Sequence, residues 1–418
     1  MEIRELTNAE FTTFSNQFTP SSFYQTAEYA FVMNHQNYDS LLIGAFNDAG
    51  NMIGASLILV EKIGVFKYAY APRGFLIDYK NLELLQEFTK KLKRFLGKKD
   101  IVAIKISPMI VRSTYDLITN QKVEDPYYEM VFQNLKTSGY FHMGYNNYFE
   151  SYKPRFEAIL DMNKPYYEIF LNFKKEMRTK IRSAEKNGIQ IYRGNENNIE
   201  YLYMQTRKKY ERDIGYFKDI YEFFSKEKKI DLYYAKLNTD TYLRVQKEEY
   251  ERLEQKVNEI NNQVLASNDS TRENIISKKL KLDKLLARAK NDLVKATNLL
   301  RDFPEGIVIA SAFIVKHQDK IQLLIDGHDK RFQEFNAKHL LLWKVIEKYS
   351  KLGYKSFNLG GVTNPTLTEN NSYIGLTQFR NGFHPNFVEY IGDLELITNS
   401  PKYFIYRQSS PLRSFIKK

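Results

Sequence analysis

Apolar residues in the middle of the chain recur at the spacing of a helix. From Tyr250 to Val264 they are spaced 3-4-3-4, and from Leu282 to Leu300 they are spaced 4-3-4-3-4. The turn-forming residues between the two sets include Ser270 and Thr271, either of which can cap the second helix. Because neither helix can bury its apolar stripe alone, the pattern predicts an antiparallel helical hairpin over residues 242–302.

This hairpin interrupts a pair of predicted strands. Residues 232–237 precede it and residues 307–315 follow it, and both runs are apolar and rich in β-prone residues. Pro304 and Gly306 end the helical pattern sharply. The simplest arrangement is two neighbouring strands with the hairpin inserted between them as an arm.

The rest of the chain alternates strands with amphipathic helices. The predicted strands are 40–46, 52–60, 101–106, 156–160 and 356–359, and the predicted helices are 82–96, 127–138, 166–187 and 338–352. We expect two successive mixed α/β units of similar layout. The first is assigned residues 1–152 and 392–418, and the second is assigned residues 153–391.

The composition is that of a globular protein, with 43% hydrophobic and 27% charged residues among 418. The chain has no Cys, which excludes disulfides, thiolate nucleophiles and Cys-ligated metal sites. The sequence lacks a Gly-rich phosphate loop, a Gly-x-Ser-x-Gly turn and a His-Glu-x-x-His motif. Its six His do not have the spacing of metal ligands. We therefore expect no metal and no cofactor.

The chain carries 62 basic and 50 acidic residues, a net charge of +12. This excess indicates a polyanionic partner, such as nucleic acid, anionic lipid or a phosphorylated substrate, although a Lys-rich surface also serves solubility. Residues 275–301 contain eight basic and two acidic residues, whereas residues 242–264 contain four and five. One face of the arm is therefore basic, either as a solvated helix or as an RNA-binding face. The candidate contacts are Lys278, Lys281, Lys284 and Arg288.

A second basic surface is predicted on the helix that ends at Gly188. Lys174, Arg178, Arg182 and Lys186 are spaced by four and fall on one helical face. Like charges in register repel one another, and a phosphate backbone or pyrophosphate would relieve that repulsion. We expect the first three to contact nucleic acid; the alternative is a solvated face.

Candidate chemistry is concentrated in two other places. In residues 66–79, aromatic side chains are interleaved with Lys67 and Arg73, which suits either the wall of a ligand-binding cleft or a strand with one buried face. Gly360 and Gly361 end a predicted strand, where backbone without a side chain can approach a ligand closely.

Arg380 lies between the aromatic residues Phe379 and Phe383, in a predicted turn-to-strand segment. A partly desolvated cation of this kind can stabilise a developing oxyanion. The alternative is an Arg that simply packs over an aromatic ring.

Several motifs occur in a characteristic order along the chain. They are Phe66–Tyr79, Lys153–Arg155, Arg178–Gly188, Glu211–Asp213, the helical arm, Leu340–Trp343, Asn358–Gly361 and Phe379–Phe383. In this order the chain resembles the Fem family of peptidoglycan aminoacyltransferases, which includes FemX, MurM and MurN. The resemblance implies two acetyltransferase-like (GNAT) units with an inserted coiled-coil arm. It also implies transfer of an amino acid from aminoacyl-tRNA to the stem-peptide amine of a peptidoglycan precursor, with lipid II as the expected acceptor.

The residues of the family map onto this chain unevenly. Its Phe-Lys pair near the chemistry falls on Phe379 and Arg380, and a tyrosine that contacts the precursor falls on Tyr216. The other residues expected to bind substrate are Lys67, Arg73, Arg155, Gly360 and Gly361.

Four positions depart from the family pattern, and the first is Arg380, where the family has Lys, a change that keeps the charge but alters its shape. The substrate-binding Arg just upstream of Tyr216 is interpreted as deleted, an Asp is replaced by Ser107, and a Lys is replaced around Met33. These departures favour a lipid-linked precursor over a nucleotide-linked one.

The implied mechanism needs no enzyme nucleophile, because the donor is already an activated ester and the acceptor is an amine. Arg380 is the candidate for stabilising the oxyanion, and no residue stands out as the general base. Two alternatives stay open. One is a catalytically inactive adaptor of the same fold that binds tRNA or lipid. The other is an N-acetyltransferase that uses acetyl-CoA, although its pyrophosphate loop is missing from the sequence.

No apolar stretch approaches the ~18 residues of a membrane span, and the first residues lack the design of a signal peptide. We therefore expect a cytoplasmic protein, and the resemblance implies peripheral contact with the inner face of the membrane. The amino acid transferred and the oligomeric state stay open.

Overall fold

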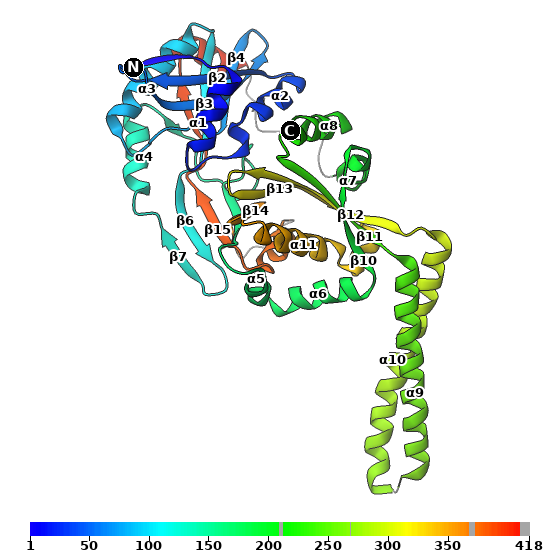
Figure 1. Cartoon of the computed structure of the whole chain (residues 1–418). Coiled ribbons are helices and arrows are strands. Elements are labelled where there is room, and N and C mark those ends of the chain that lie inside the picture. The colour runs from blue at the N-terminus through cyan, green and yellow to red at the C-terminus, as the bar shows by residue number, and fades with distance from the viewer. Residues whose placement is uncertain (209–211, 268, 368–372, 410–418) are drawn as a thin grey trace.

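The computed structural model describes residues 1–208, 212–267, 269–367 and 373–409. Two β-sheets lie side by side in the body of the molecule, and a long pair of helices projects from the second sheet (Figure 1). None of the helices in these ranges combines the length and the apolar character needed to cross a bilayer.

Seven strands form the first sheet, in the order β1-β2-β3-β4-β5-β16-β8. Their bounds are β1 Glu2–Glu5, β2 Asp39–Phe46, β3 Met52–Ile63, β4 Phe66–Arg73, β5 Ile101–Pro108, β16 Leu394–Ile397 and β8 Phe141–His142. Neighbouring strands are antiparallel except β4 and β5, which are parallel and joined by helix α3, Leu82–Gly97. The strands predicted at 40–46, 52–60 and 101–106 are confirmed.

Helix α3 begins after Asn81, whose side chain accepts a hydrogen bond from the Leu84 N–H, and it buries an apolar stripe that includes Phe88 and Leu92. The predicted helix at 82–96 is therefore confirmed. The remaining helices of this part are α1 Asn8–Gln17, η1 Phe23–Gln25, α2 Ala27–His35, α4 Tyr128–Thr137 and α13 Ser400–Ser409.

Nine strands form the second sheet, in the order β10-β11-β12-β13-β14-β9-β15-β6-β7. Their bounds are β10 Ile189–Gly194, β11 Ile230–Leu237, β12 Ile307–His317, β13 Lys320–His328, β14 Ser356–Val362, β9 Phe156–Asp161, β15 Asn386–Tyr390, β6 Val111–Asp116 and β7 Gln121–Glu124. Here β13 and β14 are the parallel pair, joined by helix α11, Ala337–Lys351. Each sheet thus contains one parallel pair with a connecting helix, which is the similar layout that the sequence predicts.

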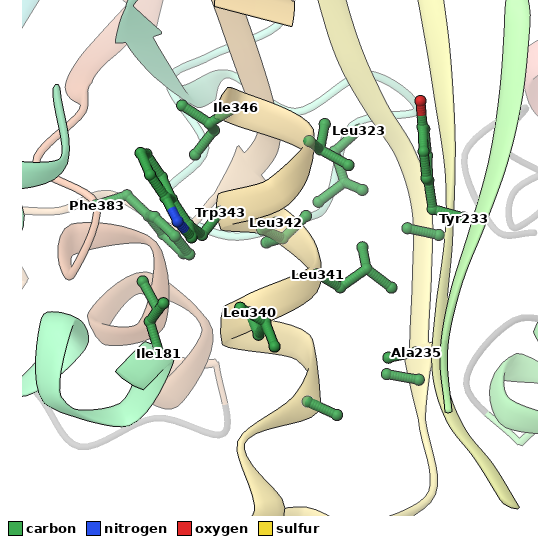
Figure 2. Close-up of a cluster of buried hydrophobic side chains, with 14 of the residues drawn as sticks. Ile181, Tyr233, Ala235, Leu323, Leu340, Leu341, Leu342, Trp343, Ile346 and Phe383 are labelled. Atoms are coloured by element: carbon green, nitrogen blue, oxygen red, sulfur yellow. The ribbon is translucent and has the colours of Figure 1, made fainter. Parts of the chain in front are cut away.

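Helix α11 supplies much of the second core. Its residues Leu340–Trp343 are buried, and Figure 2 shows Leu341 facing Tyr233 and Ala235 of β11 while Trp343 lies near Phe383. Because α11 starts at the end of β13 and is fixed by this packing, the position of its first turn relative to the sheet is well determined.

The helix predicted at 166–187 is wrong in one respect, because it is broken in two. Phe173 packs edge-on against Phe383, with 5.2 Å between ring centroids, and the Lys174 N–H donates to the Gly382 carbonyl at 3.0 Å. These contacts to a distant segment hold both residues in extended conformation. The helices of this part are α5 Tyr166–Asn172, α6 Lys175–Lys186, η2 Glu196–Asn198, α7 Ile199–Thr206, α8 Ile214–Lys226, η3 Lys330–Phe335 and α12 Ile374–Asn381.

The arm consists of α9, Thr239–Ala266, and α10, Asp269–Asp302, inserted between the antiparallel strands β11 and β12 as predicted. The predicted stripes meet along the arm, where Val257 and Ala296 are among the buried residues. Helix α10 begins at Asp269, so its bounds include Ser270 and Thr271, and the predicted capping by their side chains lies outside what the structure describes.

The two sheets exchange strands. β6 and β7 come from the part of the chain assigned to the first unit, yet they extend the second sheet next to β15. Directly after β15, the chain returns to the first sheet as β16, between β5 and β8. The division of the chain at residue 152 stays a prediction, and the sheets do not follow it between 111 and 124. Residues 410–418 of the assigned first unit lie outside the described ranges.

Glu389 of β15 connects the exchanged strands. Its carboxylate accepts hydrogen bonds from Ser113 at 2.5 Å and Tyr115 at 2.7 Å, and it forms ion pairs with Arg155 and Arg112. Burial alone would raise the pKa of Glu389, but the two hydroxyl hydrogen bonds and the two guanidinium charges outweigh it and lower the pKa.

We expect Glu389→Gln to lower the free energy of unfolding by about 3 kcal/mol at pH 7, because one partner of a buried network is lost. Since the folded-state pKa is lowered, this stabilisation is present above the unfolded pKa and disappears as pH falls through the folded value. Urea unfolding at pH 7 and pH 4 measures it, with exposed Glu227→Gln as control. An equal difference between wild type and Glu389→Gln at both pH values would contradict the prediction.

Candidate active site

The parallel strands β13 and β14 separate before they end. They pair only from Lys320 to Gln322 and from Ser356 to Asn358, although both continue further. Beyond the separation, β13 ends at Asp326-Gly327-His328 and β14 ends at Gly360-Gly361-Val362. The carboxyl ends of neighbouring parallel strands are the usual place for a ligand in an α/β sheet, so this opening is the first candidate site.

Arg380 crosses the end of β14. It lies in the last turn of α12, which corrects the predicted turn-to-strand segment, and its guanidinium donates to the Gly361 carbonyl. Gly360 has a φ of 92°, and a Cβ there would lie 3.1 Å from Arg380 Nη2. A side chain at residue 360 would therefore be strained and would press on the guanidinium. Arg380 is 8% exposed, so its charge is largely removed from water.

The ring of Phe379 packs against Phe383 and contacts two polar residues of α11. The Lys338 ammonium lies 4.2 Å from the ring centroid, and the His339 imidazole contacts the ring edge-on at 5.0 Å. Lys338 also forms an ion pair with Asp326 at 2.5 Å. The structure thus brings together residues from β13, α11, β14 and α12.

Arg73 lies between the two sheets. It donates to Glu157 at 2.6 Å and to the Pro154 carbonyl at 2.8 Å, and Glu157 also accepts from Asn358 of β14 at 2.7 Å. Burial lowers the pKa of Arg73, but Glu157 and two neighbouring tyrosines raise it more, so the guanidinium is a permanent charge. Arg155 is likewise buried, in its pair with Glu389. Both arginines predicted to bind substrate are therefore held by carboxylates.

Two cavities meet at Arg73 and Met109. The larger, of about 580 Å³, lies between β4 and α4, and the smaller, of about 160 Å³, lies over the second sheet. Among other residues, the larger is lined by Phe75, Asp78, Tyr79, Lys80, Tyr127 and Tyr128, and the smaller by Ser21, Glu157, His317, Gln322, Ser356 and Asn358. Together they form a cleft between the two sheets that is both aromatic and polar.

Tyr216 lies in the first turn of α8 and is buried. The guanidinium of Arg212 stands 3.9 Å from the centroid of the Tyr216 ring. Arg212 is thus the arginine that lies against Tyr216 in this chain, and the deletion of the family's arginine upstream of Tyr216 stays a prediction.

The structure shows what surrounds Ser107 and Met33, two other positions at which the chain departs from the family pattern. Ser107 donates to Asp393 at 2.6 Å, so a carboxylate stands beside that position after all. Met33 is buried in α2. A cation from elsewhere reaches the aromatic residues near α2, since the Lys153 ammonium lies 3.1 Å from the ring centroid of Tyr24.

Lys67 does not join these residues. It stands at the start of β4, where its ammonium lies 3.5 Å from the Lys99 carbonyl, and Arg73 stands at the other end of the same strand. At ~3.3 Å per residue the two positions are roughly 20 Å apart.

The arm carries a continuous basic face. Lys278, Lys281, Lys284 and Arg288 of α10 are exposed, fall on one side of the helix and form no ion pair with any residue of the described ranges. On α9, by contrast, basic residues pair with glutamates one turn away, as Arg244 does with Glu248. Of the second predicted surface, Arg182 is exposed on α6, Arg178 is half-buried, and Lys174 precedes the helix.

A family model described as the FemAB family matches residues 6–409. The chain belongs to the FemAB family. Aminoacyltransferase FemA of Staphylococcus epidermidis is 23% identical to it, with 99% of this chain and 100% of the relative covered. Lipid II:glycine glycyltransferase of Staphylococcus aureus is 24% identical, with 98% and 96% covered.

A solved structure of FemX shares the fold of this FemAB-family chain, with a TM-score of 0.73 and 22% identity over 97% of this chain and 99% of that one. The family and the fold class implied by the order of motifs are confirmed. The matches make the chain an aminoacyltransferase.

Sequence reasoning missed the polar residues at the start of α11. In the sequence, His339 is one of six histidines without metal-ligand spacing, and Lys338 is the first residue of a predicted helix. The sequence contains one signal for these residues, which is their position relative to the preceding strand. Asp-Gly-His at the end of a strand is followed by a helix that begins near Lys338-His339, and a strand end and the next helix start meet at one edge of a sheet.

Proposed function

We propose that this FemAB-family chain moves an amino acid from aminoacyl-tRNA to the stem-peptide amine of lipid II, building the interpeptide bridge of peptidoglycan. The observation that carries the tRNA donor is the basic face of α10, because a row of exposed cations without acidic partners suits a phosphate backbone. The acceptor is supported by a relative that is named a lipid II:glycine glycyltransferase.

The reacting groups are proposed to meet at the ends of β13 and β14. The amine attacks the ester carbonyl of the donor, and the negative charge that develops on the oxygen is stabilised by the fixed positive charge of Arg380. The ring of Phe379 shields this charge from water, and the bare backbone of Gly360 and Gly361 allows close approach.

The precursor is proposed to lie in the cleft between the sheets, with its phosphates toward Tyr216 and Arg212. Arg73 and Arg155 are assigned a positioning role, because their charges are already compensated by Glu157 and Glu389. A lipid-linked acceptor requires that the protein work at the inner face of the membrane through peripheral contact.

The proposal is tested by incubating the protein with radiolabelled aminoacyl-tRNA and lipid II, with and without RNase. RNase-sensitive label on the lipid supports it. Retention of tRNA without transfer would instead indicate a catalytically inactive adaptor, and label arriving from acetyl-CoA would indicate an N-acetyltransferase. A panel of differently charged tRNAs then identifies the amino acid.

A further inference from the structure

Aminoacyl transfer must move a proton, and neither of the two residues proposed at the reacting groups, Arg380 and Phe379, can carry it. The attacking nitrogen loses a proton as the amide forms, and the ribose oxygen of the tRNA gains one as it leaves. Arg380 stays charged at any working pH and Phe379 has no titratable group. A group with an accessible lone pair is required beside them.

Among the described residues, His339 and Lys338 are titratable side chains in contact with Phe379, and Lys338 is held in its ion pair with Asp326. His339 lies in the first turn of α11, and its ring meets the Phe379 ring edge-on at 5.0 Å and 82°. The next residue along α12 is Arg380, which is bound to Gly361 at the end of β14. The imidazole therefore contacts the sequence neighbour of the arginine proposed to hold the oxyanion.

The surroundings keep this imidazole neutral. Burial is the largest influence, and the charges of Lys180 on α6, Lys338 on α11 and His328 on β13 act in the same direction, lowering the pKa of His339 to about 4. The Asn336 carbonyl acts the other way, and Lys338 is itself paired with Asp326. The same positive surroundings disfavour the ammonium form of an incoming amine, which must be neutral to attack.

The nitrogens of the ring are not equivalent. Nδ1 is buried and makes no hydrogen bond of acceptable geometry within the described residues, and the carbonyl that raises the pKa belongs to Asn336. We assign the proton of the neutral ring to Nδ1, which leaves the lone pair on Nε2 to accept a proton from a substrate.

We propose that His339 takes the proton from the attacking nitrogen and delivers it to the departing ribose oxygen. The inference rests on the proposed function. A carbon–nitrogen bond forms, the carbon–oxygen ester bond breaks, and one proton passes from nitrogen through the imidazole to the 3′ or 2′ oxygen. The enzyme is unchanged at the end, and no further reactant is needed.

The test compares single-turnover transfer from aminoacyl-tRNA to lipid II by wild type, His339→Ala and His339→Gln. Loss of a positioned base typically costs 10²–10⁴-fold, so we expect both variants to slow by at least about 100-fold. Their affinity for tRNA should stay within about twofold of wild type. His35→Ala is the matched control, since His35 meets Phe223 edge-on at 5.0 Å and 85°, outside the proposed site.

Added imidazole separates a chemical role from a structural one. It should restore part of the rate of His339→Ala, increasingly as pH rises and imidazole becomes neutral, whereas sodium chloride at equal ionic strength should not. Two results would overturn the inference: His339→Gln with a near wild-type rate, or loss of rate in His339→Ala without any imidazole rescue. If wild type itself transfers nothing, the proposed function fails as well, and the two failures are distinguishable.

Discussion

Replacing Arg380 by alanine is expected to lower the rate of aminoacyl transfer by ~10²–10³-fold, because such a group stabilises charge that exists only in the transition state. The guanidinium is buried and bound to the Gly361 carbonyl, so the variant also loses about 1–3 kcal/mol of stability from an unsatisfied carbonyl, and it stays folded. Single-turnover rates and thermal unfolding of the same preparation separate the two effects.

Arg380→Lys is the matched control for this prediction. It keeps the positive charge but loses the planar group that spans Gly360 and Gly361. We expect a rate between those of wild type and Arg380→Ala. Full activity in Arg380→Ala would remove Arg380 from the mechanism, whatever its effect on the melting temperature.

The second large effect is expected on the arm. Changing Lys278, Lys281, Lys284 and Arg288 together to glutamine should weaken tRNA binding by ~10²-fold at 0.15 M salt, because four phosphate neutralisations are lost. The slope of log affinity against log salt should fall by about 3 for the same reason. Filter binding or fluorescence anisotropy over a series of salt concentrations measures both quantities.

A general loss of positive charge would also weaken tRNA binding, so the control must remove the same number of charges elsewhere. Exposed or half-buried cations of α3 and its C-cap provide it when Lys90, Lys91, Arg94 and the C-cap residue Lys98 are changed to glutamine. If the α3 variant loses as much affinity as the arm variant, the arm is not the tRNA-binding element.

Local patterns were sufficient to predict the arm. The apolar stripes through Val257 and Ala296 arise from residues that are close in sequence and lie on one face of each helix. Their spacing alone therefore indicates two helices that pack on each other. The strand pair β11–β12 was predictable for the same reason, because its residues are apolar and its connection is marked by Pro304 and Gly306.

Contacts between distant segments cannot be predicted from local sequence patterns. The break at Phe173 and Lys174 depends on Phe383 and Gly382, more than 200 residues away, and no local pattern shows it. The candidate site also depends in part on contacts between distant segments. Phe379 and Arg380 were recognisable from a motif, whereas His339 gains its chemical interest only from the ring and the charges that the fold places around it.

The connections between the two sheets restrict how the cleft can move. The chain passes from β5 to β6 through Met109 and Ile110, and from β15 to β16 through Ile391–Asp393, and the Ile391 N–H donates to the Ile110 carbonyl at 2.8 Å. Two short, mutually bonded tethers resist the hinge rotation that many two-domain enzymes use to close on their substrates. A molecule that enters the cleft therefore meets a gap of preset width, and adjustment is left to the side chains that line it.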